Sequence, residues 1–333
     1  MTMAMTLLKL LVGLLVLTGG AEMLVRGASR LAMRFGVSPM IVGMTVVAIG
    51  TSTPELAVSV SAAFTGSTDI AMGNVVGSNI CNIGLVLGLS ALIWPLGVGR
   101  ETRAFLFIML ASSFLVPIMS LDTQIGRVDG LILLAGMGLM TWWLVANRDR
   151  HLVEPPPDLV AETPEDDSDL TFWQQVNKSL DLLPVQIIFI VSGIALLVMG
   201  SDLIVDAARI IAMALGVSER VIGLTLVAFN TSLPELATSL VAVIRKDTAI
   251  GVGNLIGSNI TNVLLVLGAT SVVTAVPAGL TVARIVDLAM MLGVEIGLIV
   301  AVLRRERVGR AAGAAFVGAY LGYTIYLFVG AAN

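Results

Sequence analysis

The chain has 333 residues, of which 57% are hydrophobic and only 13% are charged. This charged share is about half of that in a soluble globular domain, so most of the chain is predicted to lie in lipid. The formal net charge of −4 does not indicate a nucleic-acid partner, because the acids gather in one loop. Cys81 is the only cysteine, which excludes intramolecular disulfides and cysteine metal clusters.

Apolar stretches long enough to cross a bilayer follow one another along the chain. A spanning helix needs roughly 20 apolar residues, and the first stretch lacks the basic start and the cleavage site of a signal peptide. We therefore predict an all-α polytopic membrane protein with ten transmembrane helices and no enzymatic activity. The predicted spans lie near residues 5–25, 40–63, 70–96, 104–121, 129–147, 184–205, 220–243, 249–275, 283–303 and 311–330.

A polar, proline-containing and acidic segment separates the fifth span from the sixth. Its composition is typical of a solvated linker. It could also bind Ca²⁺ as a regulatory site, but it lacks the glycine turn and the regular ligand spacing of a Ca²⁺ loop. The chain is therefore divided into residues 1–147, an acidic loop at 148–183 and residues 184–333.

The two halves contain copies of one sequence. The segment from Gly43 to Gly88 aligns without gaps to the segment from Gly223 to Gly268, at an offset of 180 residues and with 25 of 46 positions identical. Glu22 and Asp202 also align at this offset, and a solvated helix end is the favoured interpretation of both. One five-span unit therefore occurs twice.

An odd number of spans in each unit requires the second copy to lie inverted relative to the first. Under the positive-inside rule, alternate loops carry 14 Lys and Arg on the cytoplasmic side and 5 on the other. Both termini are therefore predicted to lie outside, and the loop at 148–183 is predicted to be cytoplasmic. Inverted repeats are typical of transporters whose site lies at the midplane, where the copies meet.

The second and seventh spans each contain a proline followed by a glutamate. Pro54 precedes Glu55, and Pro234 precedes Glu235. Because proline lacks an N–H, Pro54 frees the carbonyl of the residue four positions earlier, and Pro234 does the same in the second copy. An ionised glutamate at this depth must be neutralised. Two facing glutamates supply the two negative charges that one Ca²⁺ balances.

The third and eighth spans add hydroxyl and amide oxygens. Ser78 and Asn82 are spaced i, i+4 and share a helix face, as do Ser258 and Asn262. Hard cations such as Na⁺ and Ca²⁺ prefer such oxygen ligands. We therefore predict a hard cation as the cargo and include Asn82 and Asn262 in the site.

The paired motifs GTSTPEL with GNVVGSNICN and NTSLPEL with GNLIGSNITN resemble the alpha-repeats of the cation/Ca²⁺ exchanger superfamily, most closely its prokaryotic Na⁺/Ca²⁺ exchangers. This resemblance implies antiport of Na⁺ and Ca²⁺ by alternating access, with the first and sixth spans sliding as a gate. It also implies a prokaryotic inner (plasma) membrane location, with no cofactor and no protein partner beyond the bilayer. The ligands it implies are the carboxylates of Glu55 and Glu235, the hydroxyls of Thr51, Ser52, Thr231, Ser232, Ser78 and Ser258, and the carbonyls of Ala48 and Ala228.

Two positions depart from the pattern of that superfamily. Asn262 stands where several similar exchangers carry an aspartate, which leaves two carboxylates in the core of the site. Asn230 stands in place of the usual glycine, and its side chain either crowds the cavity or offers another oxygen. The alternatives to Na⁺/Ca²⁺ exchange are H⁺/Ca²⁺ antiport, K⁺-dependent exchange and a cation channel.

Overall fold

The structure is a computed structural model that describes residues 3–99, 102–147, 182–215 and 219–332. Nearly all of the described chain is helical, as predicted, and only residues 182 and 183 of the acidic loop at 148–183 are described. Helices of the first half are α1 (Met3–Phe35), α2 (Pro39–Val42), α3 (Ala48–Thr51), α4 (Thr53–Phe64), α5 (Thr68–Cys81), α6 (Gly88–Ile93), α7 (Thr102–Met119) and α8 (Arg127–Ala146), with π-helical segments η1 (Gly43–Val47) and η2 (Asn82–Leu87). Helices of the second half are α10 (Leu183–Ala214), α11 (Glu219–Ile244), α12 (Thr248–Thr261), α13 (Gly268–Val273), α14 (Val282–Arg305) and α15 (Arg310–Ala332), with the π-helical segment η6 (Asn262–Leu267).

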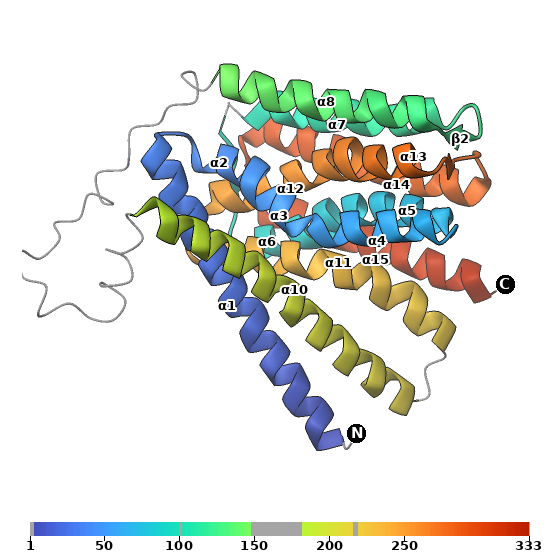
Figure 1. The fold of residues 1–333 in the computed structure, drawn as a ribbon, viewed down its shortest axis with the longest axis horizontal. Helices are drawn as coiled ribbons and strands as arrows, with labels where there is room; N and C mark the ends of the chain where they lie inside the picture. Colours follow the sequence, from blue (N-terminus) through green and yellow to red (C-terminus); the bar gives the residue numbers. More distant parts are fainter. Residues whose placement is uncertain (1–2, 100–101, 148–181, 216–218, 333) are drawn as a thin grey trace, which may run out of the picture.

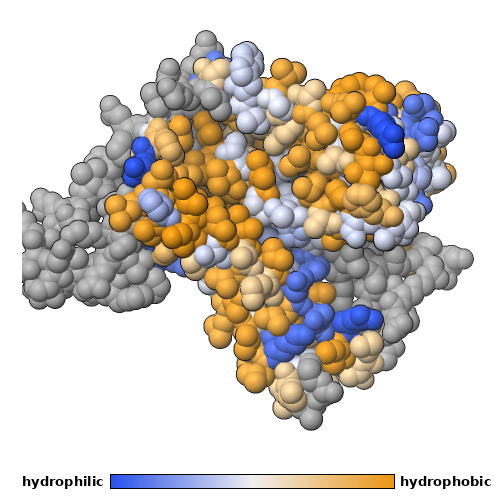
Figure 2. Space-filling model, viewed as in Figure 1, coloured by the Kyte–Doolittle hydropathy of each residue, from blue (hydrophilic) through white to orange (hydrophobic). Residues whose placement is uncertain are grey.

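These helices are long and apolar enough for a membrane protein. Eight spans of the described chain qualify by length and hydropathy, and the bent pair Pro39–Thr51 and Thr53–Phe64 makes a ninth. The 26 residues of α11 exceed the roughly 20 that a span requires. Figure 2 shows hydrophobic residues over most of the face in view, with hydrophilic residues gathered in a few patches.

The first and sixth spans are longer than the sequence predicted. We predicted spans at 5–25 and 184–205, but α1 has 33 residues and α10 has 32. In Figure 1 both helices run diagonally across the other helices, which lie close to parallel. A tilted helix crosses the same hydrocarbon thickness with more residues, and hydropathy alone does not report tilt.

Two short strand pairs join the halves reciprocally. β1 (Leu96–Gly97) of the first half pairs antiparallel with β4 (Arg307–Val308) of the second. β3 (Val276–Pro277), which follows α13 as β1 follows α6, pairs antiparallel with β2 (Gln124–Ile125) of the first half. Equivalent strands therefore find their partners in the opposite repeat, as a pseudo-twofold relation between the repeats requires.

Helices α1 and α10 pack against each other through glycines. A Cβ atom added at Gly20 would lie 2.8 Å from the carbonyl oxygen of Gly193, and one added at Gly200 would lie 2.5 Å from the backbone nitrogen of Leu17. The two backbones are therefore in direct contact, as small residues allow in membrane helices. The two helices lie side by side along their length in Figure 1 and form one pair.

Polar contacts connect α1 to the short segment between α11 and α12. Glu22 of α1 accepts hydrogen bonds from Arg26 and from Arg245, which follows α11. Ser29 of α1 donates to Asp247, directly before α12, at 3.1 Å. The expectation that Glu22 is a solvated helix end is therefore wrong, because an arginine from the second repeat reaches it.

The glycine contact between α1 and α10 gives a stability prediction. Replacement of Gly20 by alanine places a Cβ against the Gly193 carbonyl and should destabilise the fold by about 1–3 kcal/mol through overpacking. Gly19→Ala is the matched control, because a Cβ there meets no atom within 4 Å. Thermal unfolding of the purified variants in detergent measures both, and an equal effect of the two substitutions would contradict the close packing.

Candidate ion-binding site

The second span breaks at the predicted site. Helix α3 ends at Thr51 and α4 starts at Thr53, with a 42° bend between them. Pro54 lies in the first turn of α4, where its missing N–H costs no helical hydrogen bond. Glu55 therefore lies at a helix start, where unpaired N–H groups and the helix dipole favour a negative charge.

The seventh span, unlike the second, is not broken at its proline. Helix α11 runs without interruption through Pro234. The carbonyl of Asn230, which this proline leaves without its helical partner, accepts a hydrogen bond of 2.7 Å from the Ser201 hydroxyl on α10. The predicted need for a partner is correct, and a serine of the second repeat meets it.

The two glutamates meet in the interior of the protein. Both Glu55 and Glu235 are completely buried, and the charge on Glu235 acts on Glu55. Ser52, beside Glu55 in the first repeat, donates to an oxygen of Glu235 in the second repeat at 3.4 Å. The juxtaposition predicted from the duplicated motif is therefore present.

Many of the predicted ligands carry buried oxygen atoms without hydrogen-bond partners. In the described part of the chain, seven such atoms belong to six of the predicted ligands. A buried oxygen that lacks a partner costs about 1–3 kcal/mol, so a cluster of them indicates a missing ligand. The atoms are both carboxyl oxygens of Glu55, Oε2 of Glu235, Oγ of Ser78 and Ser232, and Oδ1 of Asn82 and Asn262.

The remaining predicted hydroxyls also lie at this cluster. Thr51 and Ser258, from opposite repeats, lie with their hydroxyl oxygens 3.5 Å apart, and both face Glu235. Thr231 and Ser78 face Glu55. Hydroxyls from both repeats thus approach each carboxyl group.

The two predicted carbonyl ligands differ in what can be described. The Ala48 carbonyl accepts from the Ser52 backbone nitrogen at 2.9 Å and from the Thr51 hydroxyl at 3.4 Å. Ala228 lies within α11, but its contacts are outside the described part of the structure. Both carbonyls stay predictions as ion ligands.

Two equivalent asparagines hold the ligand-bearing helices in place. Asn74 donates to the Glu55 carbonyl at 3.1 Å and to the Ser59 hydroxyl at 2.9 Å, and it accepts from Thr231 at 3.2 Å. Asn254, its counterpart, accepts from Thr51 at 3.1 Å. Both asparagines therefore form hydrogen bonds between helices.

Four further asparagines form a reciprocal cluster between the repeats. Asn82 donates to Oδ1 of Asn259, and Asn262 donates to Oδ1 of Asn79, both at 3.1 Å. Asn79 and Asn259 each donate to the other's backbone carbonyl at 3.3 Å. Because the side-chain nitrogens of Asn82 and Asn262 are used in this way, their Oδ1 atoms stay free for the ion cluster. The π-helical segments η2 and η6 begin at these two residues, as π turns often do at functional sites.

Asn230 neither crowds the ion cluster nor adds an oxygen to it. Its Oδ1 accepts from Ser201 at 2.6 Å, and its nitrogen donates to Asp202 at 3.4 Å. Both partners lie on α10, so Asn230 connects α11 to the α1 and α10 pair. At the equivalent Gly50, an added Cβ would lie 2.4 Å from the Ile194 side chain of α10, which would have to move to admit an asparagine.

One buried carboxyl near the site was absent from the sequence prediction. Glu295 of α14 is completely buried and accepts from Ser113 of α7 at 2.8 Å. It also accepts from Asn259 at 3.4 Å. The signal that would have found it is a lone acid in the middle of an apolar span, without a counterpart in the duplicated motifs.

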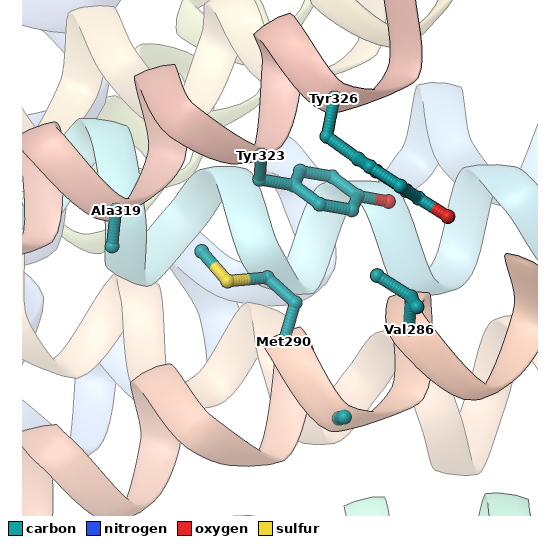
Figure 3. Close-up of a pocket in the computed structure, with 6 residues that line it drawn as sticks. Val286, Met290, Ala319, Tyr323 and Tyr326 are labelled. Atoms are coloured by element: carbon teal, nitrogen blue, oxygen red, sulfur yellow. The ribbon is translucent and has the colours of Figure 1, made fainter. Parts of the chain in front are cut away.

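A groove between α14 and α15 is separate from the ion cluster. Its volume is about 400 Å³, and its lining is mainly apolar. Figure 3 shows Ala319, Tyr323 and Tyr326 of α15 facing Val286 and Met290 of α14. None of the predicted ion ligands lines this groove.

The inverted repeats and the buried oxygen cluster define a secondary transporter of hard cations. Comparison with known proteins identifies the family. The model of the family described as sodium/calcium exchanger protein matches residues 5–146 and 185–329. This chain therefore belongs to the sodium/calcium exchanger family.

The chain is similar along most of its length to individual relatives. It is 36% identical to the inner membrane protein YrbG of Escherichia coli, with 96% of this chain and 95% of that protein covered. It is 30% identical to the sodium/calcium exchanger MaX1 of Methanosarcina acetivorans, with 78% and 81% covered. A solved structure of the sodium-calcium exchanger NCX_Mj matches with a TM-score of 0.80 and 31% identity, over 98% of this chain and all of the other.

The unequal bonding of the two equivalent asparagines gives a second prediction. Asn74→Ala removes three short hydrogen bonds, including the one to the Glu55 backbone, and should lower the free energy of unfolding by about 1–3 kcal/mol. Asn254→Ala should cost less, because its bond with Ser239 is longer at 3.5 Å. Chemical or thermal unfolding without added ions compares the two. A larger loss in the Asn254 variant would contradict this ranking.

Proposed function

We propose that this protein exchanges Na⁺ for Ca²⁺ across the membrane, with Ca²⁺ bound between Glu55 and Glu235. The single observation that carries the proposal is the cluster of unpartnered buried oxygens around these two carboxyl groups. The oxygens of this cluster belong to carboxylates, hydroxyls and amides, which are ligands that suit hard cations and not soft metals. Membership of the sodium/calcium exchanger family supports both ions as substrates.

Charge balance supports Ca²⁺ at the centre of the site. Two ionised carboxylates in lipid are expensive unless neutralised. One divalent cation neutralises the pair, and several monovalent cations divided among the same oxygens do so as well. One set of ligands cannot hold Ca²⁺ and Na⁺ at once. The two ions therefore compete for the site, and this competition couples their transport.

Alternating access requires part of the protein to move past the site. We propose that α1 and α10 move together, because their backbones are in contact through Gly20, Gly193 and Gly200. Their polar connections to the other helices include Glu22 with Arg245 and Ser201 with Asn230. Such contacts can break and re-form as the pair slides, whereas a packed core resists sliding.

H⁺/Ca²⁺ antiport is the second candidate. Membrane-buried carboxyl groups carry protons as readily as they bind cations, and this chain buries Glu55, Glu235 and Glu295. Proteoliposomes with separately imposed Na⁺, K⁺ and pH gradients distinguish the candidates. Ca²⁺ uptake that follows the pH gradient and ignores Na⁺ would replace our proposal with this one.

The proposed site predicts the behaviour of two glutamate variants. Glu55→Gln and Glu235→Gln each remove one of the two charges and should abolish Na⁺-driven Ca²⁺ uptake in proteoliposomes. They should also abolish the thermal stabilisation by Ca²⁺, which amounts to about 2.7 kcal/mol at a hundredfold excess over Kd. Glu306→Gln is the control, because Glu306 is exposed and pairs with Arg103 at the surface. Normal stabilisation of either glutamate variant by Ca²⁺ would exclude the assignment.

We further propose a prokaryotic inner membrane location with both termini outside and residues 148–183 in the cytoplasm. The distribution of basic residues supports this orientation. Because Cys81 is the only cysteine and is buried, a Cys81→Ser background permits single-cysteine labelling. A membrane-impermeant maleimide should label Asn333→Cys in intact spheroplasts and Arg150→Cys only after permeabilisation. The reverse pattern would invert the topology.

A further inference from the structure

Glu295 breaks the pseudo-twofold symmetry of the protein. The equivalent position in the first repeat, at the same offset of 180 residues, is Leu115. Glu295 is nevertheless completely buried in the middle of α14. Glu295 has no acidic counterpart in the first repeat, so the symmetric ion cluster does not explain why a carboxyl group is buried at this position.

The hydrogen bonds of Glu295 fall on one oxygen only. Oε1 accepts from the Ser113 hydroxyl at 2.8 Å and from the Asn259 amide at 3.4 Å. Oε2 is buried and has no hydrogen-bond partner among the described residues. An ionised carboxylate accepts at both oxygens, whereas a carboxylic acid accepts mainly at its carbonyl oxygen and carries a proton on the other. Oε2 is therefore the oxygen of Glu295 that is available to carry a proton.

No positive charge compensates Glu295 within the described structure. Helix α12 and segment η2 contribute no titratable side chain there. Of the arginines on neighbouring elements, Arg103 pairs with Glu306, and Arg310 donates to backbone carbonyls of α6. In hydrocarbon an unpaired carboxylate is expensive, and a single bound proton removes that cost. Among the other groups on elements packed against α14, Asp69 pairs with Arg284, and Tyr323 donates to Asp287. The remaining titratable or charged groups on these elements are Cys81 of α5, Arg307 of β4, and Tyr320 and Tyr326 of α15.

We propose that Glu295 is a proton-binding site that is linked to the central ion site through Asn259 and Asn82. The Asn259 nitrogen donates to Glu295, and its oxygen accepts from the Asn82 nitrogen at 3.1 Å. This chain of bonds leaves Oδ1 of Asn82 unpartnered at the ion cluster. The state of Glu295 thus bears on an amide whose orientation determines whether an oxygen or a nitrogen of Asn82 faces the cation.

The linkage has a defined sign. A cation at the centre favours negative charge nearby, so cation binding promotes release of the proton from Glu295. The carboxylate then holds the Asn259 nitrogen by a stronger, charge-assisted hydrogen bond and fixes the amide orientation that the cation requires. The counterpart Asn79 meets the uncharged sulfur of Met291 at 3.8 Å, so the first repeat has no such proton site. The link to Ca²⁺ rests on the proposed function, whereas the proton site itself does not.

Infrared difference spectroscopy of the purified protein tests this proposal directly. Ion-free wild type at neutral pH should show a carboxylic-acid C=O stretching band that is absent from Glu295→Gln, since both proteins retain Glu55 and Glu235. Addition of Ca²⁺ should remove this band and release up to one more proton per protein from wild type than from Glu295→Gln. Met291→Leu is the matched control and should keep both the band and the proton release.

The outcomes separate the proton site from the proposed function. Absence of any band assignable to Glu295 in the ion-free protein would overturn the proposal, as would a band that persists unchanged while wild type binds Ca²⁺. If wild type binds no Ca²⁺, the proposed function fails, and the ion-free spectrum still decides whether Glu295 holds a proton. If Glu295→Gln does not fold, Ser113→Ala replaces it. Removal of one donor should shift the band to higher frequency, and an unshifted spectrum would overturn the assignment.

Discussion

The structure is organised around the cost of placing two carboxylates in the interior of a membrane protein. Glu55 and Glu235 are fully buried and act on each other electrostatically. Neither charge can be dispersed into water, and no basic residue of the described chain lies between them. In the proposed function, a bound cation is the compensation that allows both acids to be ionised.

The inverted repeat produces this arrangement from one motif that occurs twice. One motif provides a carboxylate, hydroxyls and an amide, and the pseudo-twofold axis brings a second set to face the first. The asparagines show how far the symmetry extends, because Asn82 contacts Asn259 just as Asn262 contacts Asn79. The amide nitrogens of Asn82 and Asn262 donate to the opposite repeat, and their oxygens have no hydrogen-bond partner within the described structure. Assembly of the two halves therefore completes the site as well as the fold.

The sequence predicted the parts of the structure that duplication and hydropathy encode. The span count, the inversion and the meeting of Glu55 with Glu235 followed from one repeated motif and an odd number of helices. Tilt was not predictable, so α1 and α10 proved longer than expected. Partners in the other repeat were also invisible, which is why Glu22 was interpreted as a solvated helix end although Arg245 reaches it. Glu295 was missed because it lies outside the repeated motif, and only three-dimensional packing places it beside Asn259.

The two halves are alike in sequence but unlike in one mechanical respect. The second span is divided by a 42° bend at Ser52, whereas its counterpart α11 continues unbroken through Pro234 and is held to α10 by Ser201 and Asn230. Perfectly equivalent halves would make the conformations open to either side of the membrane mirror one another in free energy. Because the first half is bent at Ser52 and the second half is held to α10, the two open conformations are not required to have equal free energy. In the proposed alternating-access cycle, the ion-free protein is therefore not required to populate the two open conformations equally, even without an ion gradient.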